Sequence, residues 1–88
     1  MTSTYMISLT TENALRVLQR ISTVFTRNRI NIEQLNVFET PLSGISHFHI
    51  VIHVDDVLIL KIIKQLAKII EVIDVDISNK ISLNKKVS

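Results

Sequence analysis

The chain has 88 residues and a mass of 10.0 kDa, which is the size of one small domain. Hydrophobic residues make up 47% of it and 24 residues are Ile or Val, so the composition excludes a disordered chain. The longest apolar run, at residues 57–60, is far too short for a membrane span, which takes roughly 20 residues. The chain contains no cysteine, which excludes disulfides, thiolate metal sites and cysteine nucleophiles.

The charged residues predict a folded domain followed by a basic tail. Residues 79–88 carry three lysines and no acidic residue, whereas residues 1–78 carry seven Lys or Arg against eight Asp or Glu. We therefore expect a nearly neutral domain over residues 1–78 and a flexible basic tail over residues 79–88. A domain without a basic field does not attract phosphate backbones, so no nucleic-acid partner is expected. The N-terminus has no secretory signal, and we expect a cytoplasmic protein.

The first two predicted elements are a strand and an amphipathic helix. Apolar and polar residues alternate over residues 5–11, which is typical of a strand with one buried face. Thr11 or Asn13 can supply the N-cap of a helix over residues 14–27. Its apolar side chains follow helical spacing at Ala14, Val17, Leu18, Ile21, Val24 and Phe25.

A second strand is predicted over residues 30–37, and its apolar pattern is irregular. The alternation slips by one residue between Ile32 and Leu35, which turns the later side chains to the other face. This slip predicts a bulge near Glu33 and Gln34.

The second half of the chain predicts a hairpin turn, a strand, a helix and a final strand. The only proline and the only glycine bracket the turn at residues 41–44, and residues 47–54 show the clearest alternation of the chain, with Val51 among the polar positions. Asp55 and Asp56 suit the start of a helix, where negative charge is favoured. The buried stripe of that helix consists of Ile59, Ile62, Ile63, Leu66, Ile69 and Ile70. The last strand is predicted to begin at residue 72, and its inward-facing side chains are expected to be Ile73, Val75 and Ile77.

The element order βαββαβ predicts an α+β, ferredoxin-like sandwich. Its antiparallel four-stranded sheet carries both helices on one face. Right-handed connections arrange the strands as fourth, first, third and second. The second strand then lies at an edge, and it is apolar and free of lysine. We expect a homodimer that pairs this edge through Ile30, Ile32, Leu35 and Val37.

No group of residues predicts a metal or catalytic site. His47, His49 and His53 share one strand face, but successive members are about 7 Å apart and do not converge on one ion. Asp74 and Asp76 have no nucleophile or pocket beside them. A small enzyme of this fold is therefore not expected. The open sheet face is expected to hold no aromatic ring, unlike that of an RNA-recognition domain, and it either docks a protein or is hydrated.

Motifs in a fixed order extend over residues 5–78. They are Glu12-Asn13, Phe25, Asn31-Ile32-Glu33, GISHFHIVI at residues 44–52 and KQLAKIIEVIDV at residues 64–75. Together they resemble the ACT domain of the small regulatory subunit of acetolactate synthase, also called acetohydroxyacid synthase.

The resemblance implies a regulatory chain with no catalytic residues and no cofactor. Such a subunit associates with a thiamine-diphosphate-dependent catalytic subunit of branched-chain amino acid (valine, leucine and isoleucine) biosynthesis and raises its activity. In many members it also transmits feedback inhibition by valine, bound between the first loop of one copy and the second strand of another. The implied effector-binding residues are Asn13, Ala14, Leu15, Arg16, Asn31 and Ile32. From the residues alone, Asn13 can equally be only an N-cap and Asn31 only a strand start.

Two positions depart from the family pattern. Arg16 replaces a glycine in the first turn of the helix, which opposes valine binding, and Arg29 stands where a glycine usually precedes the second strand. Many members continue into a second domain, so activation by this chain is expected to depend on its ACT domain. The alternative function is a stand-alone amino-acid-binding ACT module that serves another metabolic enzyme.

Overall fold

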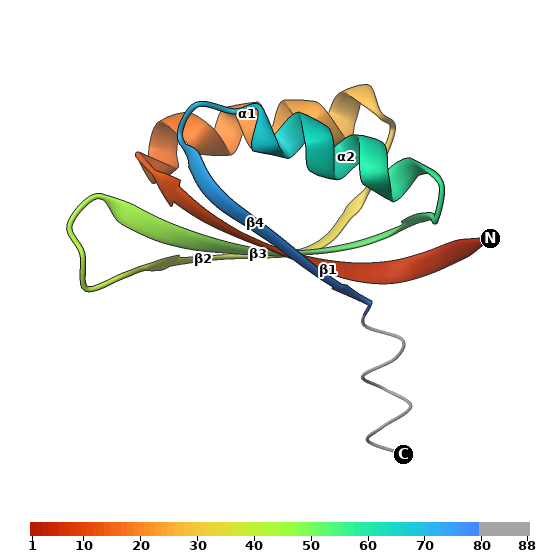
Figure 1. Ribbon diagram of the computed structural model, residues 1–88, viewed down its shortest axis with the longest axis horizontal. Coiled ribbons are helices and arrows are strands. Elements are labelled where there is room, and N and C mark those ends of the chain that lie inside the picture. Colours follow the sequence, from red (N-terminus) through yellow and green to blue (C-terminus); the bar gives the residue numbers. More distant parts are fainter. Residues whose placement is uncertain (80–88) are drawn as a thin grey trace, which may run out of the picture.

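The computed structural model describes residues 1–79 and has two layers (Figure 1). The elements are, in chain order, β1 (Thr2–Glu12), α1 (Ala14–Arg27), β2 (Ile32–Glu39), β3 (Ile45–Asp55), α2 (Leu58–Ala67) and β4 (Val72–Asn79). The four antiparallel strands form one sheet in the order β2-β3-β1-β4, and both helices lie on one side of it. The predicted ferredoxin-like sandwich and its strand order are confirmed. Apart from Asn79, the predicted basic tail lies outside the described residues.

The hydrophobic core lies between the two helices and the sheet. Each helix buries residues spaced three or four apart, namely Val17, Ile21 and Phe25 from α1 and Ile59, Ile62 and Leu66 from α2. They pack against the central strands β1 and β3 through Ile7, Leu9, Phe48, Ile50 and Ile52. The edge strands β2 and β4 add only partly buried residues. Neither helix of residues 1–79 is long and apolar enough to cross a membrane.

Three residues that were expected in the core are exposed. Ile70 is 88% exposed because α2 ends at Ala67, so the predicted stripe extended one turn too far. Ile73 and Ile77 are 54% and 38% exposed because β4 is an edge strand, and its pairing with β1 shifts between Thr10 and Thr11, beside Ile73. The burial of these residues depends on where α2 ends and on the edge position of β4, and the apolar pattern does not report either.

The hydrogen bonds at the N-termini of the two helices differ from the capping bonds that the sequence predicts. Asn13 occupies the N-cap of α1, as predicted, but its side chain makes no capping bond. Before α2, the Asp55 carboxylate accepts a hydrogen bond from the backbone N–H of Val57 over 2.9 Å. Asp56 does not cap this helix and instead accepts a hydrogen bond from the Tyr5 hydroxyl over 2.7 Å.

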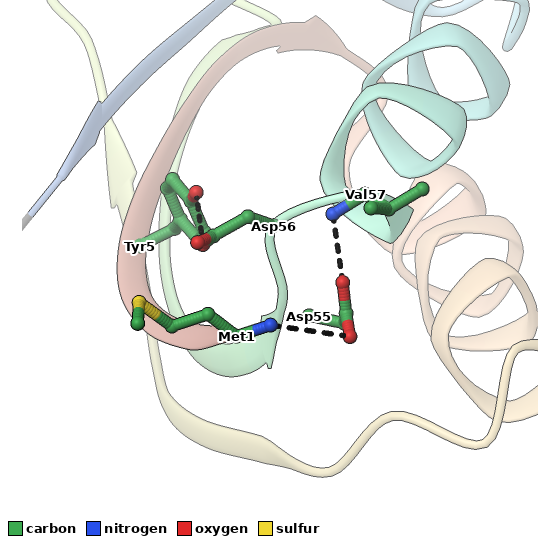
Figure 2. A network of polar contacts seen from close by, with 5 residues as sticks. All are labelled: Met1, Tyr5, Asp55, Asp56 and Val57. Atoms are coloured by element: carbon green, nitrogen blue, oxygen red, sulfur yellow. Dashed lines mark hydrogen bonds and ion pairs between the residues drawn. The ribbon is translucent and has the colours of Figure 1, made fainter.

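Polar contacts tie the start of β1 to the connection between β3 and α2 (Figure 2). The Met1 amine lies 3.8 Å from the Asp55 carboxylate, and the backbone N–H of Asp56 donates to the Met1 carbonyl over 2.9 Å. The hydroxyl of Tyr5 reaches Asp56 from further along β1. These bonds hold the entry to α2 against the sheet.

Because of this network, we expect the folding stability of the domain to depend on pH in the acidic range. The Ser3 hydroxyl and the Tyr5 hydroxyl stabilise the charged form of Asp56 and lower its pKa from the usual 3.8. The contribution of a carboxylate with a lowered pKa is present above the unfolded pKa and is lost as the pH falls through the folded one. Tyr5→Phe should therefore lower the melting temperature at neutral pH and reduce its fall below pH 3.8. Thermal unfolding of both proteins across this range checks the prediction, and equal acid profiles would contradict it.

β2 contains the predicted bulge and begins later than expected. Its pairing with β3 shifts between Ile32 and Gln34, which leaves Glu33 as the extra residue. The strand starts at Ile32 because the chain leaves α1 through Arg29, whose φ of 57° is in the left-handed region. Glycine adopts this conformation freely, and Arg29 stands where the resembling family has glycine.

Candidate effector cavity and dimer edge

The turn between β1 and α1 borders the hairpin between β2 and β3 around a cavity of about 340 Å³. The turn contributes Asn13, Ala14 and Leu15, and the hairpin contributes the segment 39–46 except Pro41. This volume is in the range of small-molecule sites. The cavity is open to solvent and combines a helix N-terminus with polar hairpin residues.

Backbone geometry holds the two sides of this cavity together. Asn13 has a left-handed φ of 55°, and its N–H donates to the carbonyl of Gly44 over 3.2 Å. Gly44 itself needs a φ of 81°, which few other residues adopt. In the hairpin, the Thr40 hydroxyl accepts from the N–H of Leu42 over 3.1 Å and donates to the carbonyl of Ile45 over 3.0 Å. The first turn of α1 contains no acidic residue, so its positive end is free to face an anionic group.

The predicted effector residues fall into two separate groups. Asn13, Ala14 and Leu15 line the cavity, whereas Arg16 is exposed and does not. Asn31 and Ile32 lie at the other end of the domain. The register establishes this separation: Ile32 is level with Ile52 and Tyr5, but Glu39 is level with Ser46 and Thr11. Within one copy, the sequence-predicted site is therefore not assembled.

The unpaired edge of β2 is long and uncharged in its middle. From Gln34 to Phe38 it has no charged side chain, and it pairs on one side only. Leu35 and Val37 face the helix layer but remain 39% and 44% exposed, because neither helix covers them. The other two predicted interface residues, Ile30 and Ile32, are partly buried against the core of their own domain. Pairing through this edge stays a prediction.

Phe38 is a surface residue that the sequence reasoning missed. It aligns with His47 on the open face of the sheet, is 50% exposed, and meets the ring of His49 edge-on at 5.3 Å. The expectation that this face has no aromatic ring is wrong, because β2 runs beyond Val37 to Glu39. A single ring on an edge strand is still not a platform on which several bases stack.

Two of the three histidines form hydrogen bonds with threonine hydroxyls on β1, and His49 contacts the Phe38 ring. His53 Nδ1 lies 3.0 Å from the Thr4 hydroxyl, and His47 Nδ1 lies 3.1 Å from the Thr10 hydroxyl. Among residues 1–79, no three His, Cys, Asp or Glu side chains gather closely enough to hold a metal ion.

Comparison of the sequence with known proteins identifies a family for this chain. The family model described as AHAS small subunit-like ACT domain matches residues 7–74. The probable acetolactate synthase small subunit of Methanothermobacter thermautotrophicus is 42% identical over 72 residues, covering 82% of this chain and 43% of that protein. The acetolactate synthase small subunit of Bacillus subtilis is 40% identical over 76 residues, covering 84% and 44%. This chain therefore spans less than half the length of these relatives.

Solved structures agree in fold. The acetolactate synthase small subunit from Thermotoga maritima superposes with a TM-score of 0.73 at 30% identity, over 83% of this chain and 45% of that one. The ACT domain of a GTP pyrophosphokinase from Chlorobium tepidum gives a TM-score of 0.74 at 18% identity, over 89% of this chain and 100% of that one, which supports the fold alone. With the family model matching most of its length and relatives about 40% identical to it, this chain belongs to the ACT-domain family of acetolactate synthase small subunits.

Proposed function

We propose that this protein is a non-catalytic regulatory subunit of acetolactate synthase that acts in the cytoplasm in branched-chain amino acid biosynthesis. The observation that carries the proposal is the family match over residues 7–74, which includes both the β1–α1 turn and β2. In this role it binds a thiamine-diphosphate-dependent catalytic subunit and raises its turnover. The regulatory chain itself contributes binding surfaces and no reacting group.

The proposed assembly is a homodimer that completes the effector site. Two β2 strands that pair antiparallel about a two-fold axis at Leu35, so that the two copies of Leu35 lie opposite each other, bring Asn31 of one copy opposite Glu39 of the other. Glu39 lies beside the cavity that Asn13 lines. The arrangement therefore carries Asn31 and Ile32 of one copy toward the cavity of its partner. Separation of the two groups within one copy supports a site that only the dimer completes.

Valine is expected to bind this site weakly or not at all. Arg16 carries a long side chain in the first turn of α1, where the family has a glycine; it does not line the cavity within one copy, so we expect it to oppose valine at the site that the dimer completes. One or two hydrogen bonds left unmade cost about 1 to 3 kcal/mol, which weakens binding roughly 5- to 150-fold. Arg16→Gly should recover part of the affinity in titration calorimetry. Arg27→Gly, the same change at the other end of α1, is the control and should not. Micromolar binding of valine by the unmodified chain would contradict the prediction.

The proposed function is tested by physical association. The chain is mixed with the acetolactate synthase catalytic subunit of the same organism, and the mass of the complex is measured by light scattering after gel filtration. We expect a stable complex whose mass equals the sum of the masses of its regulatory and catalytic subunits. Failure to associate with a folded, active catalytic subunit would reject the proposal and favour the stand-alone ACT module.

A further inference from the structure

The charges of the domain are separated between its two layers. All seven Lys and Arg of the described residues lie on the helices or within two residues of their C-termini, at Arg16, Arg20, Arg27, Arg29, Lys61, Lys64 and Lys68. Neither helix contains Asp or Glu, because all eight acidic residues belong to strands or connections. The near-neutral net charge therefore conceals a basic helical layer, which differs from the expectation of no basic field.

A cleft between the two helices lies within this basic layer. Its volume is about 380 Å³, and Arg27, Lys61 and Lys68 line it with no acidic residue among the lining residues. The Asn28 side-chain amide donates to the Gln65 side-chain oxygen over 2.8 Å and fixes the two helices beside it. Within residues 1–79, none of the three cations forms an ion pair.

We infer that the basic helical face is the surface that docks an acidic surface of the catalytic subunit. We define this face as Arg27 of α1 together with Val57, Leu60, Lys61, Lys64 and Lys68 along the outer side of α2. The inference rests on the proposed function, since it names the face through which that partner binds. Charge complementarity identifies the partner surface as acidic.

Exposed apolar residues on the same face favour a protein over a phosphate-bearing ligand. Val57 is 84% and Leu60 is 68% exposed, and both project to the same side of α2 as its lysines. Apolar anchors inside a polar rim are typical of protein interfaces, whereas binding to a phosphate backbone is dominated by charge and hydrogen bonds and does not use exposed apolar side chains. The lysines also extend over about 10 Å of helix, further than one small anion reaches.

Dimerisation through β2 would leave this face free and enlarge it. A two-fold axis that continues one sheet through paired β2 strands is perpendicular to that sheet and keeps both helical layers on the same side. The basic faces of the two copies therefore point in one direction, on the side of the sheet where Figure 1 shows the helices of one copy. On the opposite face, Asp74 and Asp76 of β4 align with Thr10 and Ser8 and keep that side acidic. The dimer thus presents one basic and one acidic face.

The experiment measures binding of the catalytic subunit at several salt concentrations. Replacing Lys61, Lys64 and Lys68 together by glutamate should raise the dissociation constant at least about tenfold at low salt and abolish its increase with salt. The three replacements by glutamine, which retain helix propensity, should act in the same direction but less. Asp74→Lys with Asp76→Lys, on the opposite face, is the control and should not weaken binding.

The outcomes separate the inference from the proposed function. If the wild-type chain does not bind the catalytic subunit, the proposed function fails and the inference with it. If wild type and both triple variants bind equally, or if only binding of a duplex RNA probe is lost in the variants, the function stands and the docking face is wrong. Circular dichroism and gel filtration establish that each variant folds and dimerises.

Discussion

Replacing Val37 by lysine should convert the proposed β2-paired dimer into a monomer. Val37 lies in the uncharged middle of the unpaired β2 edge and is 44% exposed in one copy. A charge on a paired edge opposes the addition of another strand, and each dimer would contain two such edges. If each costs about 1.4 kcal/mol, the dimer dissociation constant rises roughly a hundredfold. Sedimentation at micromolar concentration measures this directly.

A matched control separates the edge from the added charge. Val57→Lys places the same lysine at a residue that is 84% exposed and far along the chain from β2. It should leave the dimer intact. A wild-type chain that is monomeric at micromolar concentration, or equal behaviour of the two lysine variants, would reject pairing through β2.

Removing one aromatic side chain from the core should remove a large part of the stability of the domain. Phe25 is 1% exposed and packs between α1 and the sheet. Truncation of a buried Phe to Ala costs about 3 to 5 kcal/mol, and small domains are stable by only about 5 to 15 kcal/mol. Chemical denaturation should therefore unfold Phe25→Ala at a denaturant concentration far below the midpoint of wild type, or show a variant that is already partly unfolded without denaturant.

The control for this core substitution is Leu15→Ala on the same helix. Leu15 is 93% exposed, so its truncation should change the free energy of unfolding by less than about 0.5 kcal/mol. Similar losses in both variants would mean that burial in this core does not account for stability.

Periodicity predicted the six elements, and the right-handed rule for connections predicted their arrangement. Alternation and helical spacing located all six, and the slip between Ile32 and Leu35 located the bulge. These features are local, so the sequence carries them directly. The exposure of Ile70, Ile73 and Ile77 was not predictable in this way, because it depends on where α2 ends and on the position of β4 in the sheet.

The candidate site was predictable only in part. Asn13 was found through its position in a motif, and the structure places it in a cavity. The other wall of that cavity comes from the hairpin near Gly44, about 30 residues away, and no local pattern reports such a contact. The basic helical layer had a usable signal, since no acidic residue falls within either predicted helical stretch. The net charge of the whole domain did not reveal this layer, because the acidic residues of the strands and connections offset the basic residues of the helices.

Turnover of the catalytic subunit is the most direct test of the account. The chain is titrated into the purified catalytic subunit of the same organism, with saturating thiamine diphosphate, and acetolactate formation is measured. The chain alone should form no product, and its addition should raise the rate to a plateau at a fixed ratio of the two proteins. An unchanged rate, with a catalytic subunit that another small subunit does activate, would contradict the assignment as a regulatory subunit.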